Sequence, residues 1–87
     1  MLTVDQIKEA GKKAIRNDSH VYVVIAKGEV QVWEHSASYE VISIGQPVIA
    51  HLDQGAIKYD NIIYNNTVHT LESFVDAIND EYAYLEA

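Results

Sequence analysis

The 87-residue sequence contains no cysteine, a single proline and only four glycines. Without cysteine the chain can form neither disulfides nor thiolate nucleophiles nor thiolate metal sites, and its composition suits a reducing cytosol. The glycines stand singly, so there is no glycine-rich loop to cradle a phosphate. No run approaches the ~20 apolar residues of a membrane span, and the first residues lack the pattern of a signal peptide. We therefore expect a cytoplasmic protein.

Length and composition predict one domain that spans residues 1–87. A chain of this size has a single core, which buries about 60 to 65% of the surface of the unfolded chain. Hydrophobic residues make up 48% of the sequence, as in ordinary globular proteins, and no repeat, linker or low-complexity segment interrupts it. We expect the whole chain to fold.

The net charge of -7 is spread unevenly. Residues 1–16 carry four basic and two acidic side chains, whereas the rest of the chain carries two basic and eleven acidic ones. Nucleic-acid binding depends on Lys and Arg neutralising phosphates, so the acidic body argues against direct binding to DNA, RNA or an anionic membrane. A basic protein partner fits this charge. An acidic surface that only keeps the protein soluble is the open alternative.

Both ends of the chain have helical periodicity. Thr3 and Gln6 have capping-box spacing before a recurring apolar stripe, which predicts a helix from about residue 4 to 16. Thr70 stands at the N-cap position before LESFVDAINDEY, whose apolar residues follow the same period. Gly11 lies on the apolar stripe of the first helix, where glycine costs about 1 kcal/mol relative to alanine. We interpret it as a point of close approach to the sheet or to the second helix.

Between these helices the sequence alternates like β-strands, and turn signals divide it into four or five of them. A two-residue turn at Lys27-Gly28 would place Tyr22 opposite Trp33 and His20 opposite His35. A three-residue turn at 36–38 would then pair the next strand with the second one. We predict an α+β fold of two layers, with an antiparallel sheet of four to five strands flanked by an N-terminal and a C-terminal helix.

The predicted register gives the sheet two different faces. One is aliphatic, and we expect the helices to cover it; its members are Val23, Ile25, Val30, Val32, Ile42 and Ile44. The other is rich in rings and consists of His20, Tyr22, Val24, Trp33, His35, Tyr39 and Val41. Exposed apolar patches often mark interaction surfaces, which Tyr and Trp dominate. Three accounts stay open: residues 47–64 or a helix cover this face as a second core, a homodimer buries it through sheet faces or edges, or another protein binds it.

The C-terminal helix has an acidic face made of Glu72, Asp76, Asn79 and Asp80. Asp80, Glu81 and Glu86 lie toward its C-terminal end, where negative charge opposes the helix dipole by a few tenths of a kcal/mol each. Local helix stability does not explain these residues. A solvated face is one interpretation, and a face that docks on a basic partner is the other.

Catalytic and metal sites have little support in the sequence. The four histidines have no i, i+4 helical partner and form no short cluster, and the pair His20 and His35 lacks further ligands because Glu34 and Glu40 fall on the opposite face. No serine stands in a G-x-S-x-G motif. We predict no enzymatic activity, no metal site and no cofactor.

In size, acidity and element order the chain resembles the small acidic inhibitors that bacteriophages make against host systems, including anti-CRISPR proteins and nucleic-acid mimics. No motif carries this resemblance, so it implies an inhibitory binding module and assigns no residue. We predict a protein-binding module that inhibits or adapts a basic, nucleic-acid-handling protein. Its partner-binding residues would be Tyr22, Trp33, His35, Tyr39, Glu72, Asp76 and Asp80. The alternative is a homodimeric structural or accessory protein whose interface is the aromatic sheet face, and an enzyme that uses the histidines is the third hypothesis.

Overall fold

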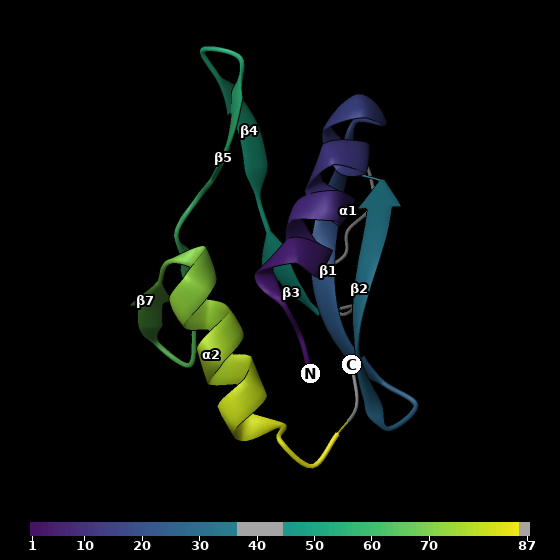
Figure 1. The fold of residues 1–87 in the computed structure, drawn as a ribbon, viewed down its shortest axis with the longest axis vertical. Coiled ribbons are helices and arrows are strands. Elements are labelled where there is room, and N and C mark those ends of the chain that lie inside the picture. The colour runs from purple at the N-terminus through teal and green to yellow at the C-terminus, as the bar shows by residue number, and fades with distance from the viewer. Residues whose placement is uncertain (37–44, 86–87) are drawn as a thin grey trace.

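The computed structural model describes residues 1–36 and 45–85, which form two helices and seven strands (Figure 1). In chain order these are α1 (Val4–Arg16), β1 (Ser19–Ala26), β2 (Glu29–Ser36), β3 (Gln46–Val48), β4 (Ala50–Asp53), β5 (Ala56–Tyr59), β6 (Ile62–Tyr64), β7 (Thr67–His69) and α2 (Leu71–Glu81). The predicted α+β class is confirmed.

Helix α1 begins at the predicted capping box. The Thr3 hydroxyl accepts a hydrogen bond from the backbone N–H of Gln6 at 3.2 Å, and the Gln6 side chain accepts one from the backbone N–H of Thr3 at 2.8 Å. These two bonds satisfy backbone donors that the first helical turn leaves unpaired. Lys13 and Arg16 lie in the last turn, where positive charge is favourable. The helix has the residue range that the sequence predicts.

Three tight turns build three antiparallel hairpins. Both residues of Lys27-Gly28 have positive φ, and so do both residues of Gln54-Gly55 and of Asn65-Asn66. Positive φ at both central residues is the type I′ geometry, whose twist matches that of paired strands. The first turn sets the β1–β2 register as predicted, with Tyr22 opposite Trp33 and His20 opposite His35. The Asn65-Asn66 turn is not among the turns predicted from the sequence.

The sheet arrangement differs from the prediction of one sheet with four to five strands. Among the described residues, a three-stranded sheet has the order β2-β1-β3, while β4–β5 and β6–β7 form separate pairs. β1 is central because β3 pairs with its second edge, Pro47 lying opposite Tyr22. Gly45 permits this approach, since a β-carbon there would overlap the Val23 carbonyl oxygen. The predicted strand at 39–44 lies outside the described residues.

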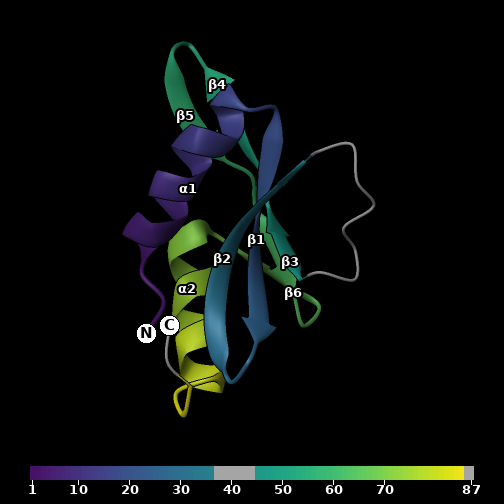
Figure 2. The ribbon, with the colours of Figure 1, turned by 90° about the vertical axis from the view of Figure 1, so that its right-hand side faces the viewer.

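Both helices lie on one side of the three-stranded sheet (Figure 2). α1 packs on β1 and β2, while α2 packs on β6, β7 and α1. The shared core consists of Leu2, Ile7, Ala14, Val21, Val23, Val30, Val48, Ile62, Leu71, Phe74, Val75 and Ile78. Within the predicted aliphatic face, Ile25 near the hairpin turn departs from this pattern, because 42% of it is exposed. Neither helix is long and apolar enough to cross a membrane.

Candidate functional site

Three acidic side chains form a row along the outer surface of α2. Leu71, Phe74, Val75 and Ile78 turn toward the core, so positions 72, 76 and 80 face outward at intervals of four residues. Glu72, Asp76 and Asp80 are all exposed. Successive carboxylates are spaced by ~6 Å along the helix axis. We call Glu72, Asp76 and Asp80 the acidic row.

The N-terminal cap of α2 fixes the start of this row. The Thr70 hydroxyl accepts a hydrogen bond from the backbone N–H of Ser73 at 3.2 Å. Ser73 Oγ in turn donates to the Thr70 carbonyl oxygen at 3.3 Å and lies 3.1 Å from His69 Nδ1. These contacts join the end of β7 to the first turn of α2. They explain why the helix starts at Leu71, with Glu72 on its outer face.

No cation of the described chain neutralises the acidic row. The ion pairs within residues 1–36 and 45–85 are Lys12 with Glu9 and His51 with Asp60. Glu72 shares a hollow of about 240 Å³ with Lys8 and Lys58 but forms no ion pair with either. The last turn of α2 contains no basic residue, and the helix dipole adds partial negative charge at this end. The negative potential should therefore be strongest around Asp76 and Asp80.

Shallow hollows flank the C-terminal half of the row. One, of about 520 Å³, lies beside Asp76 and Asp80 and is bordered by Met1 and Ala83. Another, of about 390 Å³, lies between α2 and the β6–β7 hairpin and contains Asp80 and Glu81. Asp80 borders both. A Lys or Arg side chain that entered either hollow could bring its charge next to two carboxylates.

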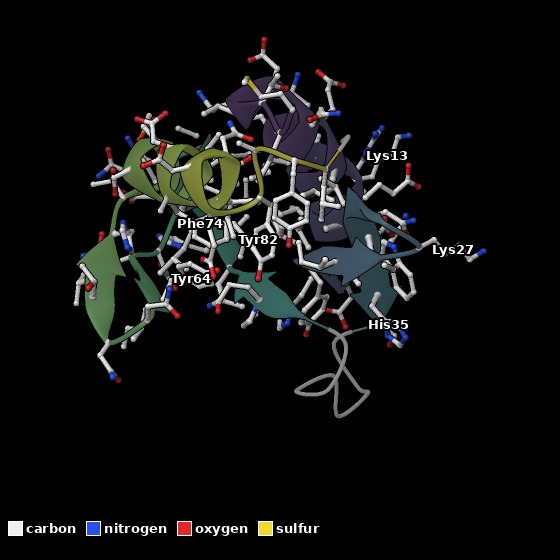
Figure 3. All side chains as sticks on the ribbon, turned by 90° about the horizontal axis from the view of Figure 1, so that it is seen from below. Lys13, Lys27, His35, Tyr64, Phe74 and Tyr82 are labelled. Carbon is white, nitrogen blue, oxygen red and sulfur yellow. The ribbon has the colours of Figure 1, made fainter. Side chains whose placement is uncertain are left out.

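Glu81, which is not among the predicted partner-binding residues, belongs to this acidic end. The Tyr64 hydroxyl donates a hydrogen bond to its carboxylate, and Asn65 Nδ2 donates another at 3.5 Å. Burial raises the pKa of Tyr64 above its ordinary value, and the bond to Glu81 raises it further, so the hydroxyl keeps its proton. Tyr64 packs edge-on against Phe74, with ring centroids 5.5 Å apart (Figure 3). The core thus holds Glu81 in place through Tyr64.

Asn79 was predicted to lie on the acidic face of the C-terminal helix, but its side chain makes a structural contact instead. Its side chain oxygen accepts a hydrogen bond from the backbone N–H of Leu2 at 2.9 Å, and its Nδ2 donates to the Leu2 carbonyl oxygen at 2.8 Å. Asn79 therefore ties the N-terminal segment to α2. This contact joins residues 77 positions apart, and no local pattern in the sequence could reveal it.

The predicted aromatic residues do not form one exposed patch. Tyr22 is only 2% exposed and packs with Val24 and Ala26, so its ring is not accessible to a partner. Trp33 is 39% exposed, and its indole N–H donates to Gln31 Oε1 at 2.6 Å. His35 packs edge-on against Tyr22, with ring centroids 6.4 Å apart. Tyr39 lies outside the described residues.

The histidines are distributed over different parts of the fold. His20 and His35 face each other across β1 and β2, whereas His51 pairs with Asp60 at 3.0 Å and His69 contacts Ser73. In the described part of the chain, no three His, Asp or Glu side chains are grouped so that they could hold a metal ion. Comparison with protein-family models, with curated proteins and with solved structures finds no match to this chain.

Proposed function

We propose that the protein is a binding module whose acidic row engages a basic protein surface, as an inhibitor or adaptor of a protein that handles nucleic acid. One observation carries this proposal: Glu72, Asp76 and Asp80 are exposed along one helix, and no described cation pairs with them. Carboxylates on a rigid helix can occupy a groove that is built for phosphates, and their field increases the rate of association.

The flanking hollows support a basic partner in particular. Because Asp80 borders both, two cationic side chains from one partner could approach it from opposite sides of the helix. The ordered Glu81 carboxylate supplies a further acceptor on the hairpin side. Arg is well suited to such sites, since its planar guanidinium donates several hydrogen bonds to carboxylates.

A catalytic role receives less support from the same geometry. His69 Nδ1 and Ser73 Oγ are 3.1 Å apart, which is within the range of a base and a nucleophile. However, Ser73 Oγ donates to the Thr70 carbonyl oxygen as part of the helix cap, and no described carboxylate binds His69 to orient it. The N-terminal cap of α2 accounts for this contact.

The homodimer through the aromatic face is not favoured either, because Tyr22 is buried.

The test is a titration of ¹⁵N-labelled protein with an octa-arginine peptide at low ionic strength, followed by amide chemical shifts. We expect the largest shifts at residues 76–83 and at the β6–β7 turn. Asp80→Lys should weaken binding by about tenfold, because one attractive contact becomes repulsive. Asp53→Lys is the matched control, since it gives the same net charge at an exposed hairpin. Equal losses in both variants, with shifts spread over all acidic residues, would contradict the proposal.

A further inference from the structure

The outer edge of β2 is open in the described part of the chain, since only β1 lies beside this strand. In a hairpin with a two-residue turn, the pair next to the turn, Ala26 and Glu29, is hydrogen-bonded, and such pairs then alternate along the ladder. Gln31 and Trp33 therefore bond to β1. Val30, Val32 and Glu34 direct their backbone N–H and C=O groups away from it. From Val30 to Glu34 the edge therefore presents six backbone groups that do not bond to β1.

Of the devices that usually protect a sheet edge, β2 has charged side chains in Glu29 and Glu34 but lacks Pro, Lys and a bulge. Edge strands are commonly kept short or carry Pro, Lys or a bulge, which prevents pairing with another chain. β3, the opposite edge of the same sheet, has three residues and contains Pro47. β2 has eight residues, with neither Pro nor Lys, and its pairing with β1 is continuous. One edge of the sheet is blocked and the other is suited to pairing.

A hollow of about 730 Å³ runs along this open edge between α1 and β2. Val30, Val32 and Ala10 supply its apolar part, while Glu9 and Lys13 stand on the helix side. A strand that paired with β2 would place alternate side chains against this apolar surface. The hollow carries charges of both signs, so a strictly basic or acidic strand would meet repulsion at one of them.

We propose that the occupant of this edge is a second copy of the chain, paired antiparallel through β2 about a two-fold axis at Val32. This register pairs Val32 with Val32 of the second copy, and Val30 of each copy with Glu34 of the other. It joins every outward backbone group from Val30 to Glu34 in six hydrogen bonds, whereas a shift of one residue pair leaves these three residues with four. On the opposite face, Glu29 of each copy lies across from His35 of the other.

The charges of α1 are complementary in the same arrangement. α1 runs in the direction of β2 (Figure 1). Asn17, after the last turn of α1, donates a hydrogen bond to Glu34 Oε1 at 3.0 Å. The two-fold axis therefore makes the two α1 helices antiparallel. Glu9 of each helix then faces the C-terminal half of the other, which carries Lys13 and Arg16. A two-fold interface must be complementary to itself, and these charges meet that condition. The acidic row of α2 takes no part, so this inference is independent of the proposed function.

Sedimentation equilibrium and amide hydrogen exchange test this dimer. We expect a species of twice the monomer mass of 9.8 kDa at high protein concentration. The amides of Val30, Val32 and Glu34 should be protected only at concentrations where the dimer forms. Those of Gln31 and Trp33 should be protected at every concentration. The proposal is overturned if the protein stays monomeric at millimolar concentration. The β2 edge would then be open to strands of other proteins.

Substitutions at the β2 edge and on α1 test whether the dimer forms through this surface. Val32→Pro removes an outward N–H and should give a monomer while the β1–β2 ladder remains. Because this substitution can also perturb folding, the charges of α1 provide a second test. Glu9→Lys and Lys13→Glu should each weaken the dimer by about tenfold, and the double variant should recover most of the loss. A dimer that none of these changes affects, or a double variant weaker than either single one, contradicts the β2 edge.

Discussion

The two helices are built alike but carry their charges differently. Each begins at a threonine cap and turns an apolar stripe into the same core. α1 has an acidic residue in its first turn and Lys13 and Arg16 in its last, as the helix dipole favours. α2 has Glu72 in its first turn but only acidic charge at its end, in Asp80 and Glu81. The charges of α1 therefore stabilise its own helix, whereas those at the end of α2 do not.

The two helices also differ in whether their charges are paired within the described chain. The charges of α1 are partly satisfied within the chain, since Lys12 lies 3.4 Å from Glu9. Asp76 and Asp80 of α2 have no such partner among the described residues. Binding surfaces commonly contain groups that are unfavourable in the free protein. The unpaired carboxylates of α2 are therefore the observation that supports its proposed binding role.

The largest effect should come from the core that both helices share. Phe74 is fully buried, so Phe74→Ala should lower the free energy of unfolding by about 3 to 5 kcal/mol, and Ile7→Ala in α1 by about 2 to 5 kcal/mol. Thermal and urea unfolding measure both. Tyr84→Ala removes an aromatic ring that is 79% exposed and should change little. Independent unfolding of α2 while α1 stays folded would show that the helices do not form one core.

The next effect concerns the contact that fixes α2 to the N-terminal segment. Asn79→Ala removes two hydrogen bonds to Leu2 and should cost about 2 kcal/mol. Asp76→Ala shortens an exposed side chain one turn earlier and should stay within about 0.5 kcal/mol of wild type. Urea unfolding compares the two. Equal losses would mean that Asn79 belongs to the acidic surface after all.

A smaller effect on stability is expected from exchanging glycine and alanine at Gly11 of α1 and Ala77 of α2. A β-carbon at Gly11 would lie 2.6 Å from the Tyr59 hydroxyl oxygen, so Gly11→Ala should destabilise the protein by about 1 kcal/mol. A Tyr59→Phe background removes the oxygen but keeps two ring carbons at 3.2 and 3.3 Å, so the same change should cost less there, because alanine favours helix by about 1 kcal/mol. Ala77→Gly in α2 should simply cost about 1 kcal/mol. The absence of coupling between positions 11 and 59 in a double-mutant cycle would refute this contact.

The elements predicted well are those whose signals are local. The Thr3–Gln6 capping box and the Lys27-Gly28 turn each act within a few residues, and they define α1 and the β1–β2 register. Gly11 is a point of close approach, but its neighbour is the Tyr59 side chain of the β4–β5 pair and not the main sheet or the second helix, as predicted. Local geometry of this kind needs no knowledge of the rest of the fold.

Residues 45–69 were harder to predict because their strands have only three or four residues. Such strands are too short to show a clear alternation, and β3 reaches β1 through a non-local pairing. The Asn65-Asn66 turn did have a signal, since Asn tolerates positive φ better than most residues. For the site, the exposure of the acidic row follows from helical periodicity. The burial of Tyr22 and the contacts of Asn79 and Glu81 depend on packing between distant segments.

The most direct test of the role of α2 measures stability and binding on one variant, Asp76→Asn/Asp80→Asn. Removal of charge from the end of α2 should raise the free energy of unfolding by a few tenths of a kcal/mol, while affinity for the octa-arginine peptide falls by about tenfold. Asp5→Asn in the first turn of α1 is the control, and it should lower stability slightly and leave affinity nearly unchanged. Unchanged affinity in the α2 variant, or the same loss in both variants, would contradict a binding role for the acidic row.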